Sequence, residues 1–397
     1  MNANVYRKVV ALALAALSIP AGVMNAQEYQ YKLSEGMATI TKYIGSGGTV
    51  SIPSTIAGLP VAYIGDGAFA GCTTLTSVTF PDTVFGIGHT AFNSCSALSQ
   101  VSLGKQLYSI GDAAFAFCFG LESIAIPAGV TTIGINPFAS CTNLDAITVE
   151  ALNPSFSSMD GVLINDVEKR LIAYPAGKIG TTYTISDGVQ SIGDSAFSVC
   201  SHLATITIAS SVTNLGNSSF GNCIGLSSMV IPNSVISIDA AAFAGCTNLA
   251  VVTISDSVVS LGSSVFSGCI RLREAYFQGI APQAGGGVFH GNEQATVYYL
   301  PGTAGWGATF CDRPTAAWVL PAPIILRTGP DFGFHNGAFG FVISWATNAS
   351  VVIEASPSAA NPAWSAVGTN ALVGGWSHFS DPQSGSGSSR YYRIHAH

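Results

Sequence analysis

The chain has 397 residues, a length that exceeds one ordinary hydrophobic core and predicts two or more structural units. Asp, Glu, Lys and Arg make up only 9% of the residues, and the formal net charge is −7. Such a chain lacks the basic surface that nucleic acids and anionic membranes require, so the composition argues against both kinds of partner.

Residues 1–26 have the features of a secretory signal peptide. Arg7 and Lys8 give a basic start, Val9 to Ile19 is an apolar run, and Ala26 marks the expected cleavage point. The apolar run is too short to span a bilayer. We therefore expect a secreted or cell-surface protein with no transmembrane segment in the mature chain.

Residues 27–63 are predicted to form an N-terminal cap and first coil, and residues 64–315 a solenoid of repeated units. The units share the consensus Ile-Gly-x-x-Ala-Phe-x-x-Cys-x-x-Leu-x-x-Val/Ile-x-Val/Ile-Pro and recur every 23 residues within each of two blocks. A fixed period of this length is typical of a solenoid, because one unit cannot bury its apolar side and stacking supplies the missing burial. The end of each unit alternates apolar with small polar residues, which predicts one continuous parallel sheet along one face. The units start at Ile64, Ile87, Ile110, Ile133, Ile192, Leu215, Ile238 and Leu261.

This repeat resembles the leucine-rich repeats of the BspA-like bacterial surface proteins, whose units share the same Ile-Gly-x-x-Ala-Phe-x-x-Cys form. The resemblance spans about residues 28 to 315. It implies a leucine-rich repeat solenoid that acts as an extracellular ligand-binding or adhesive scaffold, without indicating a particular ligand.

Eight of the nine cysteines keep the period of the repeat. We expect them to form a structural ladder of buried free thiols that act as small apolar side chains. Disulfides are the alternative in an oxidising compartment, although the parallel Cβ directions on adjacent coils would strain them. No Cys-x-x-Cys or His-x-x-x-His spacing favours a metal site, and Cys311 falls outside the ladder. The ladder consists of Cys72, Cys95, Cys118, Cys141, Cys200, Cys223, Cys246 and Cys269.

Residues 151–191 interrupt the repeat. Two strand-like runs, 159–164 and 171–175, are joined by a charged stretch, 166–170, which predicts a hairpin tip. An insertion on a regular stack is a natural contact site, so Glu168, Lys169 and Arg170 are candidate binding residues. The alternative is a solvated loop that merely interrupts the repeat.

The outward side chains of the predicted strands form two columns that are small and almost uncharged. Contact hot spots favour Trp, Tyr and Arg, and near the C-terminal end Arg273, Glu274 and Tyr276 supply such a group of side chains. They form the second set of candidate binding residues. Ser and Thr columns would also suit a repetitive surface such as ice or a crystalline polysaccharide, but such residues suit any half-exposed strand.

After Gly279 the repeat decays. Thr296 to Pro301 is the last predicted strand, and Trp306 and Phe310 are suited to closing the end of the stack. Residues 316–323, within the proline-containing stretch from Arg313 to Pro323, are predicted to be a linker.

Residues 324–397 are predicted to form a small C-terminal antiparallel β-sandwich. Strand signals at 339–345, 350–355, 365–367 and 391–394 are separated by Gly, Pro, Ser and Asn turns. We interpret the aromatic residues of this region as core, with carbohydrate stacking on Trp364 or Trp376 as the alternative.

The sequence contains no Gly-x-Ser-x-Gly elbow, His-Glu-x-x-His pair or phosphate loop, and its seven histidines are scattered. We therefore expect no catalysis, no metal site and no cofactor. The predicted function is a secreted or cell-surface repeat scaffold that binds an extracellular protein or a glycan and acts in adhesion. The alternative, from a different class, is a structural spacer or a self-assembling envelope component.

Overall fold

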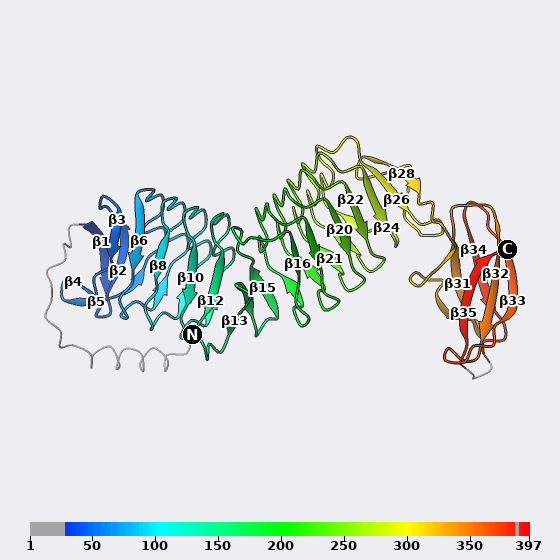
Figure 1. Ribbon diagram of the computed structural model, residues 1–397, viewed down its shortest axis with the longest axis horizontal. Coiled ribbons are helices and arrows are strands. Elements are labelled where there is room, and N and C mark those ends of the chain that lie inside the picture. The colour runs from blue at the N-terminus through cyan, green and yellow to red at the C-terminus, as the bar shows by residue number, and fades with distance from the viewer. Residues whose placement is uncertain (1–27, 386–388) are drawn as a thin grey trace. The chain divides into compact units, whose positions relative to one another are not determined.

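The computed structural model describes residues 28–385 and 389–397 (Figure 1). The predicted signal peptide, residues 1–26, lies outside the described residues. Two compact units divide the chain. The first unit is Met1–Thr181 with Val189–His202 and Ser219–Cys223, and the second is Thr182–Gly188 and Leu203–Ser218 with Ile224–His397.

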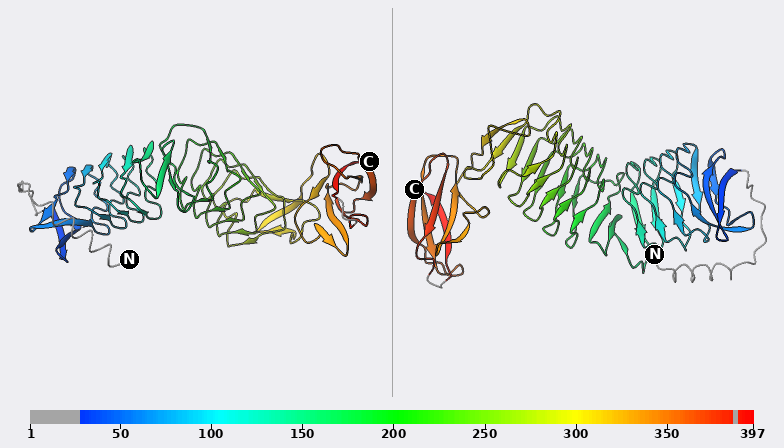
Figure 2. Two further views of the ribbon diagram at one scale, coloured as in Figure 1. Left: turned by 90° about the horizontal axis from the view of Figure 1, so that it is seen from below. Right: turned by 180° about the vertical axis from the view of Figure 1, so that it is seen from behind.

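The described residues form a β-solenoid of about 11 turns over residues 38–299, without helices, followed by C-terminal antiparallel sheets. The predicted fold class is therefore confirmed. Most turns contribute one longer strand and one two-residue strand, and Figure 2 shows these strands stacked within each unit from two further sides.

The first unit begins with an antiparallel pair, β1 (Tyr29–Ser34) and β2 (Met37–Tyr43), and with β5 (Leu59–Ile64), which pairs with both β2 and the short β4 (Thr55–Ile56). Its longer strands are β3 (Gly48–Ser51), β6 (Leu75–Thr79), β8 (Gln100–Ser102), β10 (Ser123–Ile126) and β12 (Ala146–Val149). Its two-residue strands are β7 (Gly86–Ile87), β9 (Ser109–Ile110) and β11 (Thr132–Ile133).

Two features of the strands differ from the sequence prediction. The longer strands do not form one continuous sheet, because β3, β6 and β8 form one sheet and β10 and β12 another. The second difference is a further parallel ladder, β5-β7-β9-β11, which the repeat pattern did not indicate and in which Gly86 lies in β7. A Cβ at this glycine would approach the Tyr63 ring to 2.9 Å and Ser109 Oγ to 3.0 Å, so the side chains of the two adjacent coils occupy the space beside Gly86.

A column of stacked aromatic rings forms the centre of the core. In the first unit the ring of Tyr43 stacks on Phe69 at a centroid distance of 4.9 Å, and Phe69 stacks on Phe92 at 4.7 Å. In the second unit Phe243 stacks on Phe266 at 5.5 Å and Phe266 on Phe289 at 5.6 Å. Because buried aromatic rings supply a large apolar area, this repeated contact links each coil to the next.

The insertion forms an antiparallel meander of β13 (Phe156–Met159), β14 (Val162–Asn165) and β15 (Arg170–Ala173). β15 then pairs in parallel with β17 (Ser191–Ile192), where the parallel ladder of two-residue strands resumes. The predicted hairpin tip is confirmed between β14 and β15, where Asn165 Oδ1 accepts hydrogen bonds from the backbone N–H of Val167 and Glu168 at 3.0 and 2.9 Å. The predicted run 159–164 is not one strand, since a turn at Asp160 and Gly161 divides it.

The longer strands of the second unit are β16 (Thr182–Thr184), β18 (Thr205–Thr207), β20 (Ser228–Ile231), β22 (Val251–Ile254), β24 (Glu274–Phe277), β26 (Thr296–Tyr299) and β28 (Arg313–Ala317). Its two-residue strands are β19 (Asn214–Leu215), β21 (Ser237–Ile238), β23 (Ser260–Leu261), β25 (Gln283–Ala284) and β27 (Thr309–Phe310). Arg313 to Ala317, expected to begin a linker, is thus a strand that pairs in parallel with β26. The closing role of Trp306 and Phe310 is confirmed, because both rings contact the buried Phe277, at 5.1 and 5.6 Å.

The C-terminal domain has two antiparallel sheets. One contains β29 (Ile324–Leu326), β30 (Gly333–His335), β31 (Ala338–Ser344) and β34 (Trp376–Asp381). The other has the order β33 (Ser365–Ala371), β32 (Ser350–Ser356), β35 (Tyr391–Ala396). Their shared core includes Phe341, Ile343, Val351 and Ile353. The four predicted strands are confirmed, whereas β29, β30 and β34 were not expected.

Candidate functional site

The outward columns of the strand face lie as the sequence predicts. In the second unit Ser228 pairs with Val251, Val251 with Glu274, and Glu274 with Thr296. The neighbouring column contains Val230, Thr253, Tyr276 and Tyr298 in register. These residues form a sheet surface of small side chains that ends in aromatic residues.

Three rings meet at that end, and we call them the aromatic strip: Tyr276, Tyr298 and Trp318. Tyr276 stacks on Tyr298 with a centroid distance of 4.9 Å, and Trp318 lies 4.6 Å from Tyr276. Trp318 is positioned because its backbone N–H donates to Tyr299 O at 2.7 Å, directly after β28. All three side chains are half-buried, so the strip offers both packing and polar edges.

Arg273 and Glu274 lie beside the aromatic strip and make different contacts: Arg273 bonds to nearby backbone carbonyls, whereas Glu274 bonds to the Tyr276 hydroxyl. Arg273 Nη1 donates to Ile270 O at 3.2 Å and to Leu272 O at 3.4 Å, so its guanidinium folds onto neighbouring carbonyls. Burial raises the pKa of the Tyr276 hydroxyl, and the hydrogen bond with Glu274 raises this pKa further. The arrangement can therefore present a phenol, a carboxylate and aromatic surface to a partner.

Sequence reasoning found Tyr276 but missed Tyr298 and Trp318. Tyr298 stands 22 residues after Tyr276, one residue short of the period, and Trp318 falls within the expected linker. The adjacent aromatic pair Tyr298 and Tyr299 was the available signal, since one of two neighbouring strand residues must face outward.

The charged tip of the insertion already contains an internal ion pair. Arg170 Nη2 lies 2.9 Å from Glu168 Oε2, while Lys169 adopts a positive φ of 53° and is exposed. An exposed pair of this kind contributes little stability, so the three side chains can rearrange toward a partner at low cost. The tip belongs to the first unit and the aromatic strip to the second.

A crevice lies beside Arg170, lined also by Asn136, Ile172 and Asp194, with a volume of about 40 Å³. Asn136 Oδ1 is buried there without a hydrogen-bond partner. The crevice has room for water-sized groups and is far smaller than a metabolite pocket.

The family model that describes the BspA type leucine rich repeat region matches residues 47–159 and 178–296, in six copies. The chain belongs to the BspA-type leucine-rich repeat family. The match omits most of the meander of the insertion and the entire C-terminal domain. No curated protein matches this BspA-type chain significantly.

Three solved structures show what this BspA-type chain is similar to. The pneumococcal vaccine antigen PcpA has 19% identity and a TM-score of 0.51 over 75% of this chain and 99% of that one, which shows the shared fold alone. A leucine rich cell surface protein from Faecalibacterium prausnitzii A2-165 has 27% identity over 66% and 96%, with a TM-score of 0.33. A leucine-rich repeat protein from Bacteroides capillosus ATCC 29799 has 35% identity over 32% and 98%, with a TM-score of 0.30.

Several BspA-type repeats also contribute a thiol that bonds to the preceding coil. The thiol of Cys95 donates to Phe69 O at 3.1 Å, and the thiol of Cys118 to Phe92 O at 3.2 Å. All nine cysteines are free, and only Cys72 and Cys311 are partly exposed. Burial raises the pKa of Cys141 to about 12 and that of Cys311 to about 11. These thiols are poor nucleophiles and have the environment of structural residues.

Thiol labelling tests this arrangement. In the folded chain at about pH 8, iodoacetamide is expected to modify only Cys72 and Cys311, and slowly, because the reactive form is the thiolate. All nine thiols should react after denaturation, as counted by mass spectrometry. Rapid labelling of Cys118 in the folded chain, or fewer than nine reactive thiols in the denatured chain, would contradict the ladder of free thiols.

Within residues 28–385 and 389–397, no three His, Cys, Asp or Glu side chains come close enough to hold a metal ion. No helix in this part of the chain is long and apolar enough to cross a membrane.

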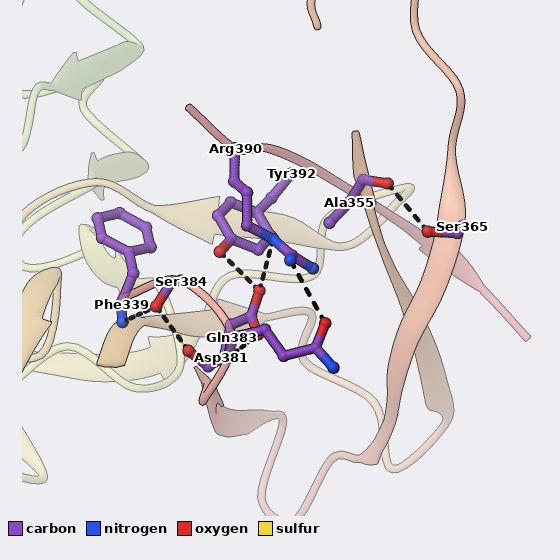
Figure 3. A network of polar contacts seen from close by, with 8 residues as sticks. All are labelled: Phe339, Ala355, Ser365, Asp381, Gln383, Ser384, Arg390 and Tyr392. Atoms are coloured by element: carbon purple, nitrogen blue, oxygen red, sulfur yellow. Dashed lines mark hydrogen bonds and ion pairs between the residues drawn. The ribbon is translucent and has the colours of Figure 1, made fainter. Parts of the chain in front are cut away.

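A buried polar network stabilises the C-terminal domain (Figure 3). Asp381 Oδ2 accepts a hydrogen bond from the Tyr392 hydroxyl at 2.9 Å and forms an ion pair with Arg390 Nε at 2.9 Å. Asp381 Oδ1 accepts the backbone N–H of Gln383 at 2.9 Å. The carboxylate therefore joins β34, the following loop and β35.

The pKa of Tyr392 is raised to about 12, mainly by burial and then by the hydrogen bond to Asp381. The folded domain therefore favours the protonated phenol. The resulting stability is fully present below about pH 10, the pKa of an unfolded tyrosine, and is lost as the pH rises through about 12. Urea unfolding of the unsubstituted chain and of Tyr392→Phe between about pH 10 and 12 should show that the free energy of unfolding falls less in the variant. Equal losses of stability in the two proteins would mean that Tyr392 does not cause the pH dependence.

Proposed function

We propose that this chain is a secreted or cell-surface protein whose repeat scaffold binds an extracellular protein or glycan and acts in adhesion. Membership of the BspA-type family and the predicted signal peptide support this function. The observation that carries it is the aromatic strip, because Tyr276, Tyr298 and Trp318 end an outward surface that is otherwise small and nearly uncharged. Trp and Tyr are the side chains that dominate contact energies.

The shape of this surface favours a broad contact over a pocket. The strand face is a parallel sheet, and the outward residues beside the strip are Thr253, Thr296 and Glu274. Such groups offer hydrogen bonds without a strong charge. A partner would therefore gain most of its affinity at the strip and its orientation from the surrounding polar groups.

An array of glycans and matrix proteins, probed with the full chain, tests the proposal. Tyr276→Ala and Tyr298→Ala should each weaken binding about tenfold or more, the loss typical of a hot-spot side chain. Val230→Ala is the matched control, because Val230 lies in the same outward column and is 66% exposed. Binding that survives both tyrosine substitutions would show that the strip is not the contact site.

We also propose the tip residues Glu168, Lys169 and Arg170 as a second contact surface. Lys169→Ala changes an exposed side chain of this tip and leaves the ion pair between Glu168 and Arg170 in place. A partner that uses the tip should bind this variant more weakly while the melting temperature stays unchanged.

The alternative function, a spacer or self-assembling envelope component, is favoured by exposed aliphatic residues on adjacent coils. Ile236 and Val259 are both exposed, and the backbone N–H of Val259 donates to Ile236 O at 2.9 Å. Such a column could pair with another copy. Light scattering over a concentration series separates the two functions, since a monomer at high concentration speaks against self-assembly.

A further inference from the structure

Among the described residues of the C-terminal domain, β35 forms a sheet edge to which no further strand is added. In the sheet with the order β33-β32-β35, β35 lies at the end and pairs only with β32 among the described strands. The opposite edge strand, β33, is engaged differently, because Asn370 Nδ2 donates to His378 O of β34 at 2.8 Å. The two edges of this sheet are therefore not equivalent.

Strand pairing shows which backbone groups of β35 are unpaired. The backbone N–H of His397 donates to Ser350 O at 3.0 Å. Because alternate residues of an antiparallel strand form the hydrogen-bonded pairs, the backbone N–H and C=O groups of Tyr391, Arg393 and His395 also point toward β32. The N–H and C=O groups of Tyr392 and Ile394 point to the open edge, as does the N–H of Ala396. Such a row of alternate donors and acceptors is a template for another strand.

The inner face beside this edge is also left uncovered. Phe339 of β31 points into the core and stacks on Tyr392 at 5.6 Å. Phe334 of β30 is the cross-strand partner of Phe339 and shares its face, with ring centroids 5.4 Å apart, and Phe332 contacts the same ring. Yet Phe334 is 65% exposed and Phe332 is 39% exposed. Phe334, on the same face as the core residue Phe339, and the adjacent Phe332 are thus not covered by any described strand beyond β35.

We infer that this open edge binds an extended peptide segment of a partner protein, which adds as a further strand beside β35. The main chain of the peptide would pair with Tyr392 and Ile394, and its inward side chains would cover Phe334 and Phe332. This requires apolar residues at alternate positions of the peptide, because successive strand side chains face opposite ways.

The outward face of β35 favours particular side chains at the remaining, outward-facing positions of the peptide. Arg393 and His395 point outward from β35, with Glu354 of β32 2.6 Å from Arg393 and 3.7 Å from His395. Acidic or hydroxyl side chains opposite these two basic residues are favourable. A second copy of β35 would instead place Arg393 and His395 against the same residues of its partner. Repulsion between the Arg393 side chains of two such strands is unfavourable, so a different protein is favoured as the partner.

The test uses the full chain and a blocked, fluorescently labelled peptide in which valine alternates with glutamate and threonine. We expect saturable binding, and weaker binding when lysine replaces glutamate. Hydrogen exchange should show new protection of the Tyr392, Ile394 and Ala396 amides, whereas the Arg393 and His395 amides, already paired with β32, should change little. Only strand addition produces this alternation.

Substitutions locate the binding site. Phe334→Ser should weaken binding of the peptide about tenfold, because a covered aromatic side chain is lost. Val373→Ser removes another exposed apolar side chain of the same domain, 78% exposed, and should leave binding unchanged. Absence of binding, or binding without alternating protection, overturns the proposal. So does self-association of the chain that protects the same amides without peptide, since a second copy would then occupy the edge.

Discussion

Replacing Phe92 with alanine is expected to destabilise the first unit by about 3–5 kcal/mol, the cost of emptying a buried aromatic site. Phe92 is fully buried and stacks between Phe69 at 4.7 Å and Phe115 at 5.2 Å, with Phe80 edge-on at 5.5 Å. The cavity would break the aromatic column between three consecutive coils. Because each coil is stabilised by its neighbours, the loss of stability should extend beyond the coil that contains Phe92. Urea unfolding followed by circular dichroism measures it.

Phe117→Ala is the control for this loss. Phe117 lies on the next coil of the same unit but is 44% exposed, and its ring contacts Phe119 at 6.3 Å. We expect a destabilisation of about 1 kcal/mol or less, in the range of partly exposed positions. Similar losses for Phe92 and Phe117 would show that the aromatic column does not dominate the stability of the coils.

Adding one methyl group at Gly111 should destabilise the solenoid by about 3 kcal/mol, at the upper end of overpacking effects. A Cβ at Gly111 would lie 2.6 Å from Gly88 C and 2.6 Å from His89 N. Both are backbone atoms of the preceding coil, so no side chain can rotate away and the coils must separate. The melting temperature of Gly111→Ala should therefore fall clearly.

Gly286→Ala provides the matched control, because a Cβ at Gly286 meets no atom within 4 Å. Its melting temperature should stay within the small range of neutral surface substitutions. If both alanine variants melt alike, the spacing of the coils tolerates a methyl group and the steric explanation fails.

The repeat pattern predicted the solenoid, its register and its core positions, because burial at fixed intervals is a local property of the sequence. The outward column through Thr253 and Tyr276 follows from strand alternation alone. The second ladder of two-residue strands was missed, since a strand such as Gly86–Ile87 is too short to show any alternation. Arg313–Ala317 was missed because its proline obscured a strand signal that only pairing with β26 provides.

The candidate site was only partly predictable for a related reason. Tyr276 could be assigned to the outward face from its place in the unit, and it lies there in register with Tyr298. The approach of Trp318 to that ring depends on the path of the chain after β28, which lies outside the repeat. No periodic pattern extends to that residue.

The repeating coil follows from the amino-acid sequence alone, because each repeat places similar apolar side chains where a neighbouring repeat can bury them. Which surfaces remain without such a neighbour depends on how the strands assemble in the folded chain. Phe334 and the edge of β35 read locally as ordinary strand residues. Their exposure depends on whether another strand lies beside them, and that is a property of the assembled sheets rather than of any segment of the chain.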